Sequence, residues 1–151
     1  MKCKIMGNNV DTNEINVIAI DGTIFRAYLA ECHVTFKLRS GETINYESVP
    51  SYEHAMVQMS EIIKFLQSHS LNNFAVLDDR FVINMDNTRR LAWKANALGL
   101  NVVEAICKNR HAYTLYEGRD EDYAEHLMSE YDKQEAKYLQ AQPTEGWKEN
   151  K

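Results

Sequence analysis

Phe74-Ala-Val-Leu-Asp-Asp-Arg-Phe-Val-Ile-Asn-Met-Asp-Asn-Thr88 is the stretch of sequence around which the rest of the chain is organised. It contains two short apolar runs, 74–77 and 81–85, separated by the charged triplet Asp78-Asp79-Arg80. Both runs are rich in β-branched and aromatic residues and have strand length, so they predict two neighbouring strands. The charged triplet cannot be buried without partners, which places it at a strand end or on an exposed edge.

Length and composition are those of a globular chain. It has 151 residues, of which 44% are hydrophobic and 26% charged, so we expect one domain with a substantial core. No apolar run approaches the roughly 20 residues that span a bilayer, and no signal peptide is expected. Three widely spaced cysteines, Cys3, Cys32 and Cys107, argue against a disulfide framework and favour a cytoplasmic location.

Charge is unevenly distributed along the sequence. The formal net charge is −5, and residues 119–151 hold nine Asp/Glu and five Lys/Arg, which is −4 of that total. The remaining residues, with 13 acids and 12 bases, are close to neutral. Nucleic-acid binders usually show a basic footprint, so DNA binding requires a small basic face that coexists with the acidic C-terminal part.

The first half of the chain predicts a weakly held start, then strands, then a helix. Residues 1–14 are polar and are expected to be flexible. Strands are expected at 15–20, 24–29, 34–38 and 43–46, with Asp21-Gly22 as a turn. Ser51 is a suitable N-cap for a helix over 51–68, and its apolar face is spaced for burial against a sheet; that face contains Met56, Met59, Ile63 and Leu66.

In the second half, the helical spacing of Leu91, Ala92, Ala95 and Leu98 predicts a helix over 86–99, closed by Gly99. Strands are expected at 100–106 and 111–116. Asp120 and the acids after it favour the start of a C-terminal helix over 119–141, and residues 142–151 are expected to form a disordered tail. The predicted fold class is α+β, with mostly antiparallel strands, one central amphipathic helix and a C-terminal helix.

The central stretch resembles the signature of the LytTR family, the DNA-binding domain of bacterial transcription regulators. Phe74, the turn at Asp78–Arg80, Phe81 and the pair Ile83-Asn84 match the order of that signature. The similarity covers roughly residues 15–116 and implies an early strand pair, one helix, the signature strand pair and a closing strand. It also implies a short strand-to-strand connection after the signature, where the residue pattern predicts a helix.

The resemblance implies that loop side chains, and not a recognition helix, read the bases. His33, Arg80, Lys108 and Arg110 fall in such loops, whereas Arg89 is a candidate phosphate contact because it begins a basic patch with Arg90 and Lys94. The predicted function is therefore a stand-alone, sequence-specific transcription regulator that binds duplex DNA, with a homodimer left open. The signature turn departs from the family in carrying Asp78 and Asp79, and Asn84 is expected to serve the fold.

The sequence also leaves other functions open. An inhibitor or adaptor could use the acidic segment Asp120–Tyr138 to bind a basic protein, for instance as a DNA mimic acting on a nucleic-acid enzyme. Cys32 with His33 lacks a second ligand pair for a metal. The carboxylates of Asp78, Asp79 and Glu104 could in principle hold Mg²⁺, but we interpret them as ordinary surface charge. No catalytic motif is present, so we expect neither an enzyme nor a cofactor or metal.

Overall fold

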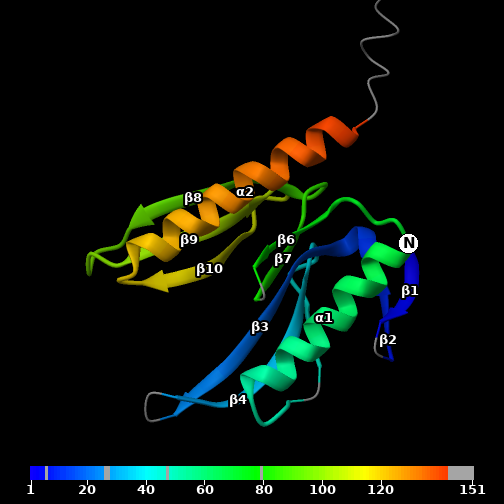
Figure 1. Ribbon diagram of the computed structural model, residues 1–151, viewed down its shortest axis with the longest axis horizontal. Coiled ribbons are helices and arrows are strands. Elements are labelled where there is room, and N and C mark those ends of the chain that lie inside the picture. The colour runs from blue at the N-terminus through cyan, green and yellow to red at the C-terminus, as the bar shows by residue number, and fades with distance from the viewer. Residues whose placement is uncertain (6, 26–27, 47, 79, 143–151) are drawn as a thin grey trace, which may run out of the picture.

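The computed structural model describes residues 1–5, 7–25, 28–46, 48–78 and 80–142, and for residues 22–25 and 28–31 it describes the backbone alone. Within these residues the chain forms two helices and ten strands in three antiparallel sheets, which confirms the predicted α+β class (Figure 1). The strand pair predicted from the central stretch is β6 (Phe74–Asp78) and β7 (Phe81–Asn84).

The five-stranded sheet lies at the centre of the molecule, with strand order β5-β4-β3-β7-β6. Its other members are β3 (Ile15–Phe25), β4 (Tyr28–Leu38) and β5 (Thr43–Asn45). A hairpin of β1 (Lys2–Ile5) and β2 (Asn8–Asp11) precedes it, followed by a 3-10 turn at Thr12–Glu14. The third sheet has the order β10-β9-β8 and contains β8 (Thr88–Ala95), β9 (Asn101–Cys107) and β10 (Ala112–Gly118).

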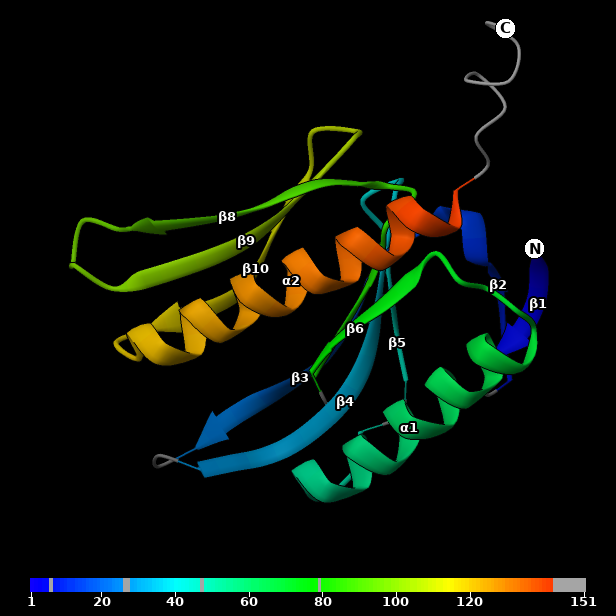
Figure 2. The same cartoon turned by 45° about the horizontal axis from the view of Figure 1, so that its top comes forward.

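Each face of the central sheet is covered by one helix (Figures 1 and 2). On one face lies α1 (Tyr52–Ser68), with Ala55, Met59, Ile62 and Leu66 buried. On the other lie the three-stranded sheet and α2 (Glu121–Ala141), which buries Ala124, Leu127 and Tyr131. Within the part of the chain that the structure describes, neither helix is long and apolar enough to cross a membrane.

Strand β3 contributes to both cores, which explains why residues 15–20 are almost continuously apolar. Ile18 and Ile20 belong to the cluster beneath α1, and Val17 and Ala19 belong to the cluster beneath α2. Alternate side chains of a strand point to opposite faces, so a strand covered on both faces needs apolar residues at nearly every position.

Both helices begin where the sequence predicts. The Ser51 hydroxyl accepts a hydrogen bond from the His54 N–H at 3.3 Å, and the Asp120 carboxylate accepts one from the Tyr123 N–H at 3.0 Å. These side chains satisfy N–H groups that have no partner inside the helix. Of the predicted α1 stripe, Met59 and Leu66 are buried, while Met56 and Ile63 are partly buried against the same core.

The predicted helix over 86–99 is wrong, because residues 88–95 form β8. This strand pairs along its length with β9, from Thr88 opposite Cys107 to Ala95 opposite Asn101. Leu and Ala favour a helix intrinsically, but the pairing overrides this preference and turns Leu91 into the α2 core while Arg89, Arg90 and Lys94 stay exposed. Gly99, at φ +77°, closes the hairpin instead of capping a helix.

Two further predictions differ from the structure in the N-terminal part. Residues 2–5 and 8–11, in the part of the chain expected to be weakly held, pair as the β1–β2 hairpin, whose Ile5 and Val10 are buried in the α1 core. Asp21-Gly22 is not a turn, because it pairs within the β3–β4 hairpin with His33 and Cys32. The centre of the strand predicted at 24–29 and nearly all of the predicted tail, 143–151, lie outside the described residues.

Candidate nucleic-acid interface

Five exposed basic residues gather where the three-stranded sheet meets the end of β4, and we call this surface the basic end. Three segments that are distant in the sequence supply it: the residue after β4, the start of β8 and the β9–β10 turn. The basic end consists of Arg39, Arg89, Arg90, Lys108 and Arg110.

One backbone hydrogen bond and one side-chain hydrogen bond hold the three segments together. The Lys108 N–H donates to the Asn87 carbonyl at 2.8 Å, which joins the β9–β10 turn to the start of β8. The Asn109 side-chain amide donates to the Arg39 carbonyl at 2.7 Å, which joins the same turn to the end of β4. The basic side chains therefore extend from segments that are joined by hydrogen bonds.

Local backbone irregularities orient individual side chains of the basic end. Between Thr88 and Arg90 the register of β8 against β9 shifts by one residue, and such a bulge redirects the side chains around it. Arg110 has φ +71°, a left-handed conformation, and its N–H donates to the Cys107 carbonyl at 3.0 Å. The Asn109 side chain also accepts the His111 N–H at 3.2 Å, so the turn is closed tightly around Arg110.

The charges of the basic end are not neutralised within the described part of the molecule. None of its five side chains has a carboxylate partner within 4.0 Å there. The acids on neighbouring segments are Glu14, Glu42 and Asp86, and Asp86 accepts a hydrogen bond from the Tyr138 hydroxyl. A surface with five cations and three nearby acids retains a net positive charge, which suits an anionic ligand.

The predicted contacts His33 and Arg80 lie elsewhere on the molecule. His33 is half-buried on β4 opposite Asp21, and the Arg80 carbonyl accepts the Ile20 N–H at 3.1 Å. The basic end lies near Ile15, the first residue of β3, whereas Arg80 and His33 lie beside Ile20 and Asp21 in the middle of that strand, so the two groups are roughly 20 Å apart along it. The structure thus brings Arg89, Lys108 and Arg110 together and separates them from Arg80 and His33.

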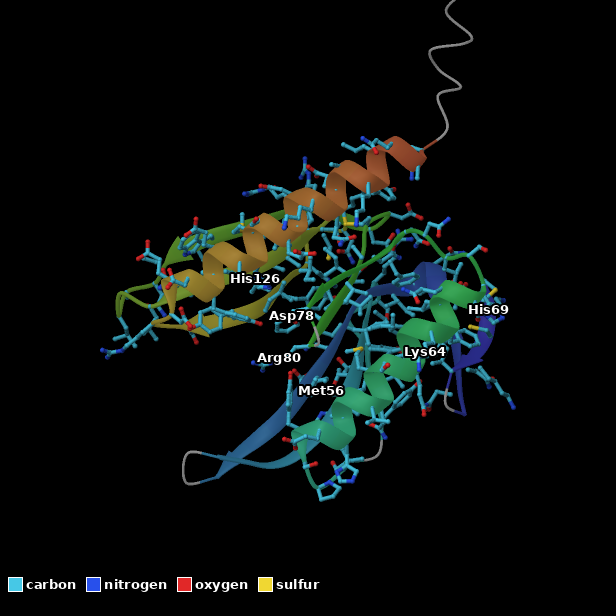
Figure 3. All side chains as sticks on the ribbon, in the orientation of Figure 1. Met56, Lys64, His69, Asp78, Arg80 and His126 are labelled. Atoms are coloured by element: carbon cyan, nitrogen blue, oxygen red, sulfur yellow. The ribbon has the colours of Figure 1, made fainter. Side chains whose placement is uncertain are left out.

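Arg80 lies between the two helices, next to Asp78 (Figure 3). Its guanidinium carbon is 5.9 Å from the centre of the Tyr52 ring and 5.5 Å from that of Phe81, within the range of cation–π attraction. The aromatic rings support an exposed arginine on the signature turn without burying its charge.

Both carboxylate oxygens of Asp78 accept hydrogen bonds from groups within the protein. One carboxylate oxygen accepts the Arg80 N–H at 2.8 Å, and the other accepts the hydroxyl of Tyr123 from α2. Burial and the bond to Asp78 raise the pKa of Tyr123, so the phenol stays protonated as the donor. Asp78 therefore ties the signature turn to α2, which explains an acid at this position.

The described residues do not assemble a metal site. Cys32 points into the α1 core and the next residue, His33, points to the opposite face of the sheet, so the two cannot share an ion. Glu104 is paired with Lys94 at 3.0 Å in another sheet from Asp78, and Asp79 lies outside the described residues. In the described ranges no three His, Cys, Asp or Glu side chains are grouped as metal ligands.

Asn84 has the structural role expected from the sequence. It is fully buried, and its amide group donates to the Ile15 carbonyl at 2.8 Å. Its side-chain oxygen accepts from the Asn73 amide at 2.8 Å and from the Asp86 N–H at 3.0 Å. The residue thus joins β3, the segment before β6 and the turn that leads to the basic end.

Arg39 is the member of the basic end that the sequence analysis missed. It follows β4 in an ordinary Ser40-Gly41 turn, and no local pattern separates it from a solvated turn residue. The signal that identifies it is the contact between its carbonyl and Asn109, 70 residues later in the chain.

A second charged surface lies on α2. Four of its acids, Glu121, Asp122, Glu125 and Asp132, are exposed to solvent.

Comparisons with family models, with curated proteins and with solved structures found no match to this chain.

Proposed function

We propose that this protein binds duplex DNA and acts as a transcription regulator, with the basic end as its main DNA-binding surface. The observation that carries the proposal is the clustering of five exposed, unneutralised cations from three segments of a chain whose net charge is −5. Phosphate contacts by Lys and Arg supply most of the non-specific affinity of DNA-binding proteins. A localised basic surface can therefore bind DNA even when the protein as a whole is acidic.

The LytTR-like signature supports the proposal independently of charge. The resemblance implies a strand-to-strand connection after the signature, and β8 follows β7 after a short turn. The resemblance also implies that turns present the contacting side chains, and Lys108 and Arg110 project from the β9–β10 turn. In this proposal the contacts come from turns and a strand start, and neither helix enters a groove.

The roles of the five predicted residues follow from their places. Arg110, on the tightly closed turn, is the candidate base reader, because an arginine fork pairs with both acceptors of a guanine edge. Arg89 and Lys108 anchor phosphates. Arg80 and His33, roughly 20 Å away along β3, extend the contact to a second stretch of the duplex and contribute less than the basic end.

The test measures binding of the purified protein to a labelled random duplex across a series of salt concentrations. The variant Arg89→Glu with Arg110→Glu should abolish binding at moderate salt, and Arg89→Ala should lower the salt slope by about one unit. The matched control is Lys64→Glu, which reverses an exposed charge on α1 far from the basic end. Failure of the wild-type chain to bind duplex at low salt would refute the proposal.

A second candidate function is protein binding through α2. Its support is the row of exposed acids Glu121, Asp122, Glu125 and Asp132, which could engage a basic protein surface. Reversal of these acids should leave binding to the random duplex intact or strengthen it, whereas it should abolish binding to a basic partner protein. The acid-reversal variants therefore test the α2 surface without removing the basic end.

A further inference from the structure

Strand β6 is an edge of the central sheet and runs between the two helices (Figures 1 and 2). The Met85 N–H donates to the Asn73 carbonyl at 2.7 Å, so in this antiparallel pair the backbone groups of Asn73 and Ala75 face β7. Those of Phe74 and Val76 alternate with them and face the open side of the strand. Within the described residues no further strand pairs with β6 on that side.

Three backbone groups at this edge are available for another strand. They are the Phe74 carbonyl and the N–H and carbonyl of Val76, because the Phe74 N–H already donates to the Leu71 carbonyl at 3.4 Å. Beyond Val76 the register against β7 shifts before Asp78, and such a bulge ends regular pairing. The open edge is therefore short, but β5 of the same sheet pairs with β4 over only three residues.

The edges of the three-stranded sheet differ from this one. Strand β8 carries the exposed Arg89, Arg90 and Lys94, and β10 has a bulge between Thr114 and Tyr116. Charged side chains and bulges keep an edge strand from pairing with other chains. The first four residues of β6 contain no charge, glycine or proline, so this stretch lacks the charged side chains that guard β8.

A small apolar recess borders the β6 edge on the α1 side of the sheet. Its volume is about 20 Å³, and Ile63, Leu66, Leu71 and Val76 line it together with Gln67. A volume of about 10–15 Å³ is enough for one water molecule. This recess therefore admits a small aliphatic group and excludes a large side chain.

A larger and more polar recess borders the same edge on the α2 side. Its volume is about 290 Å³, and Gln134, Lys137 and Tyr138 of α2 form one wall. The Gln134 amide donates to Glu130 at 3.3 Å, and the Tyr138 hydroxyl donates to Asp86, so carboxylates lie beside this wall as well as an ammonium group. Donors and acceptors are both present, which suits a long polar side chain.

The two helices also limit what can lie against the β6 edge. Each helix supplies a wall of one recess, so both extend to the edge of the sheet. A second folded copy that paired edge to edge would bring its own covering helices against them. A single extended segment needs only the spacing of one strand, about 4.8 Å in the plane of the sheet.

From these observations we infer that the β6 edge binds an extended segment of a partner protein, which adds to the central sheet as an antiparallel strand. The residue opposite Val76 points to the α1 side and is small and aliphatic, and its two neighbours point to the α2 side and are polar. In this mode of recognition main-chain hydrogen bonds supply affinity and alternate side chains supply specificity. The site uses no residue of the basic end, so it holds whether or not the protein binds DNA.

The experiment titrates the full chain with the peptide acetyl-Lys-Val-Gln-Val-Gln-Val-Lys-amide and follows the backbone amides by NMR. Saturable shifts should appear at Ile63, Gln67, Leu71 and Val76, and hydrogen exchange of the Val76 N–H should slow because it gains an acceptor. Shifts that do not saturate, or that leave exchange at Val76 unchanged, would overturn the inference.

Two methylated forms of the peptide test the pairing itself. In an antiparallel pair opposite Val76 the valine N–H groups face β6 and the glutamine N–H groups face away. N-methylation of the valines should therefore abolish binding, and N-methylation of the glutamines should preserve it. Equal binding of the two forms would contradict strand addition. Self-association of the peptide-free chain in sedimentation that Val76→Pro abolishes would assign the edge to a second copy and would also overturn the inference.

Two pairs of variants test the edge from the protein side. Val76→Pro removes the outward N–H at a position where edge strands tolerate proline, and it should abolish binding, whereas Val76→Thr retains the N–H and should bind. Gln67→Trp, on the border of both recesses, should also block the peptide. Its control, Val57→Trp, replaces a 60% exposed side chain of α1 outside both recesses and should not. Equal affinities within either pair would contradict the assignment.

Discussion

The α1 face of the central sheet is covered by one helix and the β1–β2 hairpin, whereas the opposite face is covered by α2 together with a second sheet. Side chains of the α1 core are mainly aliphatic, and one helical stripe supplies Ala55, Met59, Ile62 and Leu66. In the α2 core, tyrosines seal the edge through their hydroxyls: Tyr113 bonds to the Leu38 carbonyl, Tyr123 to Asp78 and Tyr138 to Asp86.

This difference shows how the two faces of one sheet can be covered in different ways. The α1 face is closed mainly by apolar contact, which depends on shape and area, with one tyrosine bond from the Tyr46 hydroxyl to the Ile5 carbonyl. The α2 face joins elements that are far apart in the chain, and its hydroxyl bonds connect α2 to the signature turn and to the segment before the basic end. The face that carries the candidate DNA surface is therefore the one in which several tyrosine hydroxyl bonds join distant elements.

The largest expected effect tests whether the two faces unfold together. Leu66→Ala on the α1 face and Leu127→Ala on the α2 face should each lower the free energy of unfolding by about 2–5 kcal/mol, because both side chains are almost fully buried. Since β3 contributes to both cores, each variant should retain one cooperative transition in urea, followed by circular dichroism.

The control for these variants is Val57→Ala, which truncates a side chain that is 60% exposed and should have little effect. Two separate transitions in either leucine variant would show that the two faces unfold as independent units, which would contradict the role of β3 in both cores.

A smaller effect concerns pH on the α1 face. Tyr46 is buried there and donates to the Ile5 carbonyl at 2.5 Å, and burial raises its pKa from 10.0 to about 12. The neutral phenol is favoured in the folded state, so its contribution is fully present below pH 10 and is lost as the pH rises towards 12. The two-unit difference corresponds to about 2–3 kcal/mol.

Urea unfolding of the wild type at pH 9, 10 and 11 measures this loss, and Tyr46→Phe should show a smaller decline over the same range. If the variant and the wild type lose stability equally with pH, ionisation of Tyr46 does not contribute to the decline.

The smallest effect is expected for one directional bond of the α2 face. Tyr123→Phe removes the hydroxyl that donates to Asp78 and should lower the free energy of unfolding by about 1 kcal/mol, because the bond is only partly buried. Its consequence should be local: amide exchange at Asp78 and Arg80 should accelerate more than exchange in α1. Uniform acceleration across the chain would contradict a specific tie between α2 and the signature turn.

The sequence by itself determined the elements whose signals are local. The cap at Ser51 and the stripe that follows it identify α1, and the cap at Asp120 identifies the start of α2, because a helix is stabilised by contacts within four residues. The two apolar runs of the central stretch were identified as β6 and β7 for a similar reason. Asn84 was also interpreted correctly, since an amide among buried apolar residues requires hydrogen-bond partners.

Only the tertiary structure decided the elements whose partners are distant. Residues 88–95 have good helix formers and become a strand because β9 pairs with them, and residues 2–5 and 8–11 pair as a hairpin because the α1 core accepts Ile5 and Val10. The basic end has the same origin: Arg39 and Arg110 are ordinary turn residues in sequence, and a contact between positions 39 and 109 makes them neighbours. Strand pairing and turn packing join residues far apart in the chain, so the local pattern contains no record of them.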